Sequence, residues 1–326
     1  MIDLNRRAVL GVGTAAVGLS MSGLARAQAP RSRVQALKIT VLSTMLADEG
    51  LGEWGYCALV EADGKKILFD TGAHPDLVIN NAKTLGVDLG GVEEVVLSHN
   101  HPDHTGGLPS VRKALMAGNP KAAGIAHVST NVFAPRIDAD GKPANRFATR
   151  RADYEALGGR FVVHDAPSEL APGVWHTGPV PRANPETNWG PGLRIVLPTG
   201  PVEDTVPDDS ALVFDTAQGL VILTGCGHAG IVNICEYARK VVEPAPLLAV
   251  VGGLHLYAKP DATIDWTAGR LKAMGLRYLL AGHCTGIEAT MRLRAQLGLT
   301  RQTAVVSAVG SSFTLGKGIY AGEIAA

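Results

Sequence analysis

A series of short apolar runs constrains the fold of this 326-residue chain more than any other feature. Gly, Pro and Asp punctuate the sequence between the runs, and stretches with helical spacing of apolar residues follow many of them. The turn sequences Asp63-Gly64 and Gln218-Gly219 each join two runs directly, which predicts two antiparallel hairpins. Hairpins combined with crossover helices indicate a mixed α/β architecture with more than one sheet.

The expected elements follow from these patterns. Strands are expected at 37–42, 57–61, 66–70, 94–98, 124–128, 161–164, 193–197, 211–215, 220–224, 246–251, 276–281 and 303–306. Helices are expected at 75–85, 108–117, 151–157, 230–242, 263–273 and 287–297. Segments 134–150 and 177–207 are expected to be long loops, which in compact enzymes often cover a site.

The first residues have the composition of a targeting segment. Arg6-Arg7 precedes an apolar run over 8–24, and Ala25-Arg26-Ala27 places small residues at the −3 and −1 positions of a cleavage site. The sequence around the two arginines resembles the twin-arginine export motif. A membrane anchor is the alternative, because the run is close to the shortest length that spans a bilayer.

We therefore expect a signal peptide at 1–27, a linker at 28–36 and one domain at 37–326. The expected location is the periplasm, with the twin-arginine export machinery as a partner and no stable membrane span after cleavage. Lys+Arg and Asp+Glu both total 30, and removal of 1–27 takes away three arginines and one aspartate, so the mature chain carries −2. This charge argues against binding nucleic acid through its phosphates.

Three histidines and an aspartate are concentrated directly after the apolar run Val95-Val96-Leu97. The sequence is Ser98-His99-Asn100-His101-Pro102-Asp103-His104-Thr105-Gly106-Gly107. Two histidines two residues apart at a strand end can direct both imidazoles at one cation, and the Asp-His pair that follows reaches a second position. Imidazole and carboxylate ligands favour zinc, one or two ions, with iron or manganese as alternatives. A solvated polar loop is the alternative interpretation.

These residues carry a resemblance to a known family. The stretch from His99 to His104 matches the H-x-H-x-D-H signature of the metallo-β-lactamase fold superfamily, and Leu68-Phe69-Asp70-Thr71-Gly72 resembles its first motif. The resemblance implies a four-layer αβ/βα sandwich of two mixed sheets with helices outside and a metal site at one edge. Within the superfamily, the chain resembles the dihydropterin-ribofuranosyl-aminobenzene-phosphate synthase-like branch through 178–182, 208–212, 223–230, 252–256 and 283–286.

The resemblance also implies a set of metal ligands. They are His99, His101 and His228 for one ion, and Asp103, His104 and His283 for the other. The usual third histidine, expected before the strand at 211–215, is missing; Asp208 and Asp209 stand there, and His228 is the natural replacement.

The chain departs from the superfamily at one further position. Many members carry a bridging aspartate in Thr-Gly-Asp at a strand end, where this chain has Thr224-Gly225-Cys226. Cys226 is either a thiolate ligand or a small buried residue, and both interpretations stay open. The four cysteines are expected to be metal-site thiols or inert buried residues rather than two disulfides.

Two further residues are candidates for the reaction itself. His255 is expected to act as an acid or to contact substrate, with a satisfied core histidine as the alternative. Arg182 is the candidate for binding an anionic group of a small-molecule substrate, with a surface loop arginine as the alternative. Asp103 could orient the nucleophile as well as bind metal.

The expected function is a metal-dependent hydrolase that directs activated water at an ester, lactone, thioester or phosphoester. The first alternative is a transferase like the synthase branch, which the predicted export argues against. The second alternative is a non-catalytic metal- or ligand-binding module on the same fold.

Overall fold

The computed structural model describes residues 32–325 of the chain. The predicted signal peptide and residues 28–31 of the predicted linker lie outside this part. Val34, within the predicted linker, is buried, and its amide donates to the Asp215 carbonyl at 2.8 Å. No helix in 32–325 is long and apolar enough to cross a membrane.

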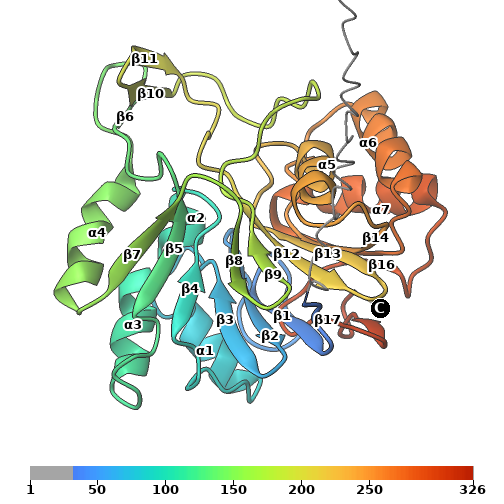
Figure 1. Cartoon of the computed structure of the whole chain (residues 1–326), viewed down its shortest axis with the longest axis horizontal. Coiled ribbons are helices and arrows are strands. Elements are labelled where there is room, and N and C mark those ends of the chain that lie inside the picture. The colour runs from blue at the N-terminus through green and yellow to red at the C-terminus, as the bar shows by residue number, and fades with distance from the viewer. Residues whose placement is uncertain (1–31, 326) are drawn as a thin grey trace, which may run out of the picture. The chain divides into compact units, whose positions relative to one another are not determined.

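The first of two large sheets is mixed and has eight strands. Its order is β18-β17-β1-β2-β3-β4-β5-β7 (Figure 1). Strands β18 to β3 pair antiparallel and β3 to β7 pair parallel, so the hairpin predicted at Gly64 joins β2 to β3. The bounds are β1 Leu37–Ser43, β2 Cys57–Ala62, β3 Lys65–Phe69, β4 Glu94–Val96, β5 Ile125–Ser129, β7 Arg160–His164, β17 Ser312–Thr314 and β18 Gly318–Tyr320.

The second sheet is also mixed and has seven strands, in the order β16-β15-β14-β13-β12-β9-β8. Strands β13 to β16 pair parallel, and β12 pairs antiparallel with β13 through the turn predicted at Gly219. The bounds are β8 Ser168–Ala171, β9 Val174–His176, β12 Ala211–Thr216, β13 Gly219–Thr224, β14 Leu247–Gly252, β15 Tyr278–Ala281 and β16 Ala304–Val306.

Helices cover the outer face of each sheet, and three buried apolar clusters fill the spaces between layers. One cluster includes Ile39, Phe69 and Phe214 and lies between the sheets. The other two lie beneath the outer helices, on the first sheet and on the second sheet respectively (Figure 1). This arrangement confirms the predicted four-layer sandwich. The helices are α1 Leu77–Thr84, α2 Pro102–Thr105, α3 Leu108–Met116, α4 Arg146–Ala156, α5 Ile231–Val241, α6 Asp261–Ala273 and α7 Ile287–Leu297.

The two expected long loops contain more regular structure than the sequence patterns predicted, although the strand expected at 193–197 is present as β10. They supply a small third sheet of β6 (Arg136–Ile137), β10 (Arg194–Leu197) and β11 (Gly200–Glu203), so β10 is not part of the sandwich. Helix α4 begins five residues earlier than predicted, because the Asn145 side chain caps it by accepting the amides of Phe147 and Ala148. Strands β8, β9, β17 and β18 were not predicted; each has only three or four residues and too few apolar positions to show alternation.

The topology brings several strand ends to one edge of the sandwich. Strands β3, β4 and β5 run parallel in the first sheet, and β13, β14 and β15 run parallel in the second. The residues that follow these strands include Asp70 and Ser98 in the first sheet, and Gly225, Gly253 and Gly282 in the second. The loops that carry the candidate ligands all begin at these carboxyl ends, as is common for sites in α/β proteins.

Candidate metal centre

The first ligand group joins three histidines from two loops. The ring centroids of His99, His101 and His228 lie 4.5 to 4.8 Å apart, and one nitrogen from each falls within 4.8 Å of the others. The Nδ1 atom of His99 contacts Ser98 Oγ at 2.9 Å, and His228 Nδ1 donates to the Asn188 carbonyl. The buried Nε2 atoms of His99 and His228 have no hydrogen-bond partner among the described residues.

The electrostatics of this group favour neutral imidazoles. Burial, reinforced by the neighbouring histidines, holds the pKa values of His99 and His228 well below the usual range. Burial also lowers the pKa of His101 to about 4. Neutral imidazole is the form that binds a metal ion, and two unpartnered ring nitrogens directed at one point fit such an ion.

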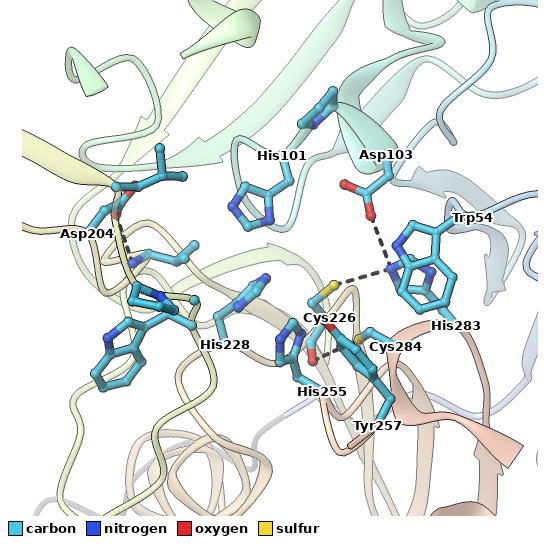
Figure 2. Close-up of a pocket in the computed structure, with 16 residues that line it drawn as sticks. Trp54, His101, Asp103, Asp204, Cys226, His228, His255, Tyr257, His283 and Cys284 are labelled. Carbon is cyan, nitrogen blue, oxygen red and sulfur yellow. Dashed lines mark hydrogen bonds and ion pairs between the residues drawn. The ribbon is translucent and has the colours of Figure 1, made fainter. Parts of the chain in front are cut away.

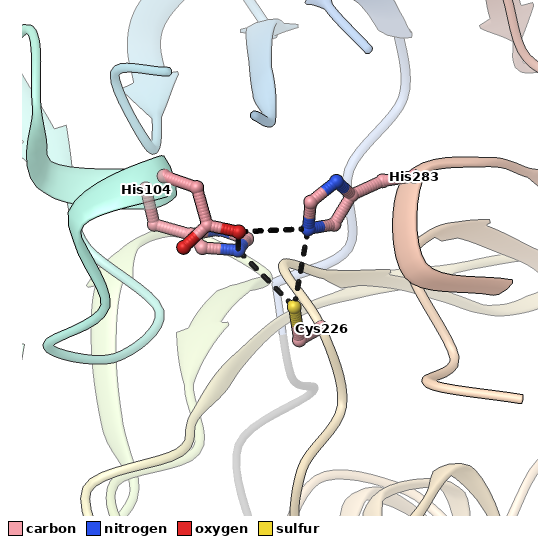
Figure 3. Close-up of side chains that lie close together, drawn as sticks. His104, Cys226 and His283 are labelled. Carbon is pink, nitrogen blue, oxygen red and sulfur yellow. Dashed lines mark hydrogen bonds and ion pairs between the residues drawn. The ribbon is translucent and has the colours of Figure 1, made fainter. Parts of the chain in front are cut away.

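The second ligand group brings together Asp103, His104, Cys226 and His283. Cys226 Sγ lies 3.1 Å from His104 Nε2 and 3.2 Å from His283 Nε2 (Figure 3). Asp103 Oδ2 lies 3.6 Å from His104 Nε2 and 3.3 Å from His283 Nε2. Four donor atoms from four residues therefore surround a single point.

The two Asp103 separations match the spacing of ligands around a tetrahedral cation, and the two separations from Cys226 Sγ are slightly shorter. Zinc–nitrogen and zinc–sulfur bonds of about 2.0 to 2.3 Å place tetrahedral ligands about 3.3 to 3.7 Å apart. Burial lowers the pKa of His104, but the carboxylates of Asp103 and Asp70 outweigh burial and raise that pKa to about 9. The charges that favour a proton on His104 would equally favour a bound cation in its place. The geometry therefore brings Cys226 among the donors, although the sequence left its role open.

One buried carboxylate, that of Asp70, holds a histidine of each ligand group in place through hydrogen bonds. Asp70 accepts hydrogen bonds from His104 Nδ1 at 2.7 Å, from the Ser98 amide at 2.7 Å and from Ser98 Oγ at 2.8 Å. Because Ser98 Oγ also contacts His99 Nδ1, Asp70 orients one ligand directly and another through a hydroxyl. Asp70 has a positive φ of 57°, a conformation uncommon for a residue with a side chain.

A buried arginine also supports the metal loop, which is the segment from His99 to His104. Asp208 Oδ2 accepts the Asn100 amide at 2.8 Å, and Asp208 Oδ1 pairs with the Arg136 guanidinium. Arg136 is 2% exposed and also donates to Asp204 Oδ2 at 2.7 Å. Arg136 lies in a segment expected to be a loop, and no feature of the sequence distinguishes it from a surface arginine.

Asp208 and Asp209 accept hydrogen bonds from backbone amides. They occupy the position at which the superfamily carries its third histidine. Asp209 Oδ2 accepts the amide of Ala229 at 2.8 Å, directly after His228. Burial raises the pKa of Asp209 to about 7 and that of Asp208 to about 6. The pair therefore fixes the two loops that carry His99 and His228, while His228 completes the first ligand group.

An open pocket of about 490 Å³ lies over both ligand groups (Figure 2). Two tryptophans, a tyrosine and a leucine supply much of its apolar lining, and no lysine or arginine of the described part of the chain contributes to it. The lining residues are Trp54, His101, Pro102, Asp103, Trp189, Gly190, Pro191, Leu193, Asp204, Val206, Cys226, His228, His255, Tyr257, His283 and Cys284. A small molecule that enters this pocket meets the ligand groups at its floor.

The two further candidates from the sequence lie in different places. His255 lines the pocket, with its ring 4.3 Å from that of His228, and its buried Nδ1 has no hydrogen-bond partner among the described residues. Arg182 is not part of the lining, because its guanidinium donates to the carbonyls of Thr205 and Val206. The structure thus brings His255 to the site, and Arg182 holds a neighbouring loop.

The remaining histidines lie away from both ligand groups, with His127, His164 and His176 buried and the His74 side chain exposed. His127 Nδ1 contacts His164 Nε2 at 2.9 Å, and His176 Nδ1 accepts the Gly178 amide at 2.9 Å. His74 contacts Glu53, a buried residue that the sequence did not single out and that holds the loop before Trp54. All four cysteines are free and buried.

Sequence comparison identifies relatives of the whole domain. Residues 55–241 match the profile of the Metallo-beta-lactamase superfamily. The chain is 32% identical over 272 residues to the 7,8-dihydropterin-6-methyl-4-(beta-D-ribofuranosyl)-aminobenzene-5'-phosphate synthase of Methanocaldococcus jannaschii, covering 79% of this chain and 90% of that protein. It is also 30% identical over 241 residues to an uncharacterized protein of the same organism, covering 73% of this chain and 86% of that protein.

Solved structures of the same superfamily also share the fold of this chain. A metal-dependent hydrolase of the beta-lactamase superfamily superposes with a TM-score of 0.66 at 25% identity, over 80% of this chain and 93% of its own. The metallo-beta-lactamase fold protein YhfI of Bacillus subtilis shares the fold, with a TM-score of 0.51 at 15% identity over 86% of this chain and 99% of its own. The fold, the motif and the relatives agree, and the chain belongs to the metallo-beta-lactamase superfamily.

Proposed function

We propose that this protein is a metal-dependent hydrolase that cleaves an ester, lactone, thioester or phosphoester bond of a small molecule. The observation that carries the proposal is the cluster of candidate ligands at the floor of one open pocket, where the two groups adjoin a third formed by Cys226, His228 and His255. A substrate in this pocket would place its reacting group next to the donor atoms of both groups.

The donor chemistry supports zinc as the metal at both groups. Three imidazoles form the first group, and a thiolate, two imidazoles and a carboxylate form the second. Thiolate with imidazole favours zinc over manganese, which prefers oxygen ligands. When bound, divalent ions of this kind make hydroxide available at neutral pH by lowering the pKa of water from about 15.7 toward about 7.

Two pocket residues are suited to position reactants and move protons. Asp103 has a side chain that is 20% exposed at the pocket floor, so its second oxygen can accept a hydrogen bond from attacking water. His255 lines the pocket beside His228, which suits it to donate a proton to the leaving group. We assign Asp103 the orienting role and His255 the role of acid.

The test combines metal analysis with turnover. The purified protein is expected to carry about two zinc ions per chain and to hydrolyse part of a panel of lactones, esters, thioesters and phosphodiesters. Chelation should abolish turnover, and zinc should restore it. His104→Ala should lose metal and activity, His255→Ala should lose activity but keep its metal, and His74→Ala, outside both groups, should keep both. Turnover that survives metal removal would refute the proposal.

A second candidate is supported by the relative from Methanocaldococcus jannaschii. A synthase matched over 90% of its length favours a transferase that acts on a pterin. Pterin retained on purification, with no hydrolysis of any panel member, would select this function. Tight zinc binding without either activity would select a non-catalytic module.

We also propose that the enzyme acts in the periplasm after twin-arginine export. The support is the arginine pair, apolar run and small-residue cleavage site within 1–27. Cell fractionation with an antibody to the folded domain tests this, and replacement of Arg6 and Arg7 by lysine should retain the precursor in the cytoplasm.

A further inference from the structure

Two large aromatic side chains stand exposed at the mouth of the pocket. Trp54 is 52% exposed between the buried residues Glu53 and Gly55, and Tyr257 is 47% exposed directly after the buried Leu256. Their ring centroids lie 5.7 Å apart with an angle of 80° between planes. Figure 2 shows both on one side of the pocket beside His283, with Asp204 on the opposite side.

The backbone that carries Trp54 is held firmly. The neighbouring Glu53 is buried, and its carboxylate accepts Ser43 Oγ at 2.7 Å and the amides of Ala73 and His74 at 2.9 Å each. The Glu53 amide donates to the Thr44 carbonyl at 2.9 Å. A buried carboxylate with several partners fixes the loop, so the exposed indole is presented on a rigid support.

The backbone that carries Tyr257 is strained as well as held. His255 and Ala258 on either side have positive φ values of 51° and 56°, which cost energy for residues with side chains. The Tyr257 amide donates to the Cys284 carbonyl at 3.1 Å, which ties this segment to the loop after β15. Strain of this kind persists where the surrounding fold imposes it and clusters at functional sites.

The charges of the side chains around the pocket limit which ligands Trp54 and Tyr257 can bind. Among residues 32–325, no lysine or arginine contributes to the lining, whereas the acidic residues Asp103 and Asp204 do. Asp204 is itself fully engaged, since it pairs with Arg136 at 2.7 Å and accepts the Val206 amide at 2.9 Å. Above the ligand groups, the wall therefore offers ring faces and no cation to an incoming ligand.

We propose that Trp54 and Tyr257 form a stacking subsite for a flat, uncharged aromatic ring system of the substrate. Because the two rings are nearly perpendicular, a ligand ring stacked on one meets the other edge to face, and both arrangements are favourable. Their fixed supports reduce the entropy lost on binding. The inference rests on the proposed function for the reacting end of the substrate, but ring binding itself needs no turnover.

The experiment measures binding of uncleaved probes by calorimetry. The probes are 2-naphthamide, its saturated counterpart decahydro-2-naphthamide, and the anion 2-naphthoate, each added to the purified protein with its metal. We expect naphthamide to bind about tenfold tighter than the saturated amide, which corresponds to about 1.4 kcal/mol. Trp54→Ala and Tyr257→Ala should each remove most of this preference. Trp54→Phe and Tyr257→Phe keep a ring and should retain it.

The controls separate this inference from the proposed hydrolase. Tyr320→Ala removes a tyrosine that is still more exposed than Tyr257 and lies outside the pocket, and it should leave all affinities unchanged. Equal affinity for the two amides would overturn the subsite, as would a preference that survives both alanine variants or tighter binding of naphthoate than of naphthamide. Ring preference without any ester turnover would refute the hydrolase and leave the subsite. Ester turnover without ring preference would support the hydrolase and refute the subsite.

Discussion

The buried arginine that supports the metal loop gives the sharpest test of how this site is built. Arg136 donates to Asp204 and Asp208, and its third nitrogen donates to the carbonyls of Asn131, Val132 and Ala134 at 3.2 to 3.4 Å. Arg136→Met keeps most of the side-chain volume but leaves two buried carboxylates without their cation. Breaking a buried ion pair on one side costs about 3 to 5 kcal/mol.

That cost converts into a measurable shift. A domain of this size loses about 0.6 kcal/mol of stability per degree near its midpoint, so Tm should fall by about 5 to 8 °C in differential scanning calorimetry. Arg151→Met is the matched control, because Arg151 is half exposed, pairs with Glu155 on the same helix and lies over the Phe133 ring. Such a pair contributes about 1 kcal/mol at most. The contact with the Phe133 ring adds about 0.5 to 1 kcal/mol, so the control should move Tm by no more than about 3 °C.

The same variant tests the link to the metal loop. Asp208 holds the Asn100 amide between two candidate ligands, so Arg136→Met should also weaken metal retention against a chelator. Adding Asp208→Asn removes one unpaired charge and keeps an acceptor for that amide, so the double variant should recover part of the lost stability. Equal Tm shifts for the Arg136 and Arg151 variants, or unchanged metal retention, would refute the reasoning.

Three further predictions concern the metal and the pH. Removing metal with a chelator should lower Tm, and zinc should restore it, because ligands from both sheets meet at each group. Cobalt-loaded protein should show a thiolate-to-cobalt absorption band that Cys226→Ser removes; a band that persists would exclude the thiolate ligand. Burial raises the pKa of Glu186 to about 7 against an ordinary 4.5, although amides of Val232 and Asn233 oppose the shift. Protonated Glu186 therefore makes its full contribution to the free energy of unfolding below pH 4.5. As the pH rises through about 7, that contribution is lost, and the free energy of unfolding falls by up to about 3 kcal/mol. Glu186→Gln should remove this pH dependence in urea unfolding; an unchanged profile would contradict the assignment.

The sequence predicted those parts of the site that short-range patterns encode. Four ligand candidates fall within six residues after one apolar run, and this spacing survives in the folded loop. His228 and His283 follow strands that read as continuous apolar runs, because both faces of a central strand are buried in a sandwich. The fold and the superfamily were confirmed on the same basis.

The remaining features depend on distant contacts and left no local signal. Arg136 lies in β6 of the third sheet, and the two buried aspartates that pair with it are about seventy residues away. Glu53 resembles a surface residue in sequence, yet it anchors the loop that presents Trp54. Arg182 fits an anion-binding pattern by type, but one of its guanidinium nitrogens donates to two loop carbonyls and the side chain does not line the pocket. Residue type predicts chemistry, whereas burial and partners are set by the whole fold.

The two ligand groups share a property that bears on how the enzyme is assembled. In the first group, His99 and His101 follow a strand of the first sheet and His228 follows a strand of the second. The second group divides in the same way, with Asp103 and His104 from one sheet and the remaining ligands from the other. Neither half of the sandwich can complete a group alone, so metal affinity exists only once the sheets have packed. Ion binding therefore stabilises the native contact between the sheets, and folding and metal loading are one linked equilibrium.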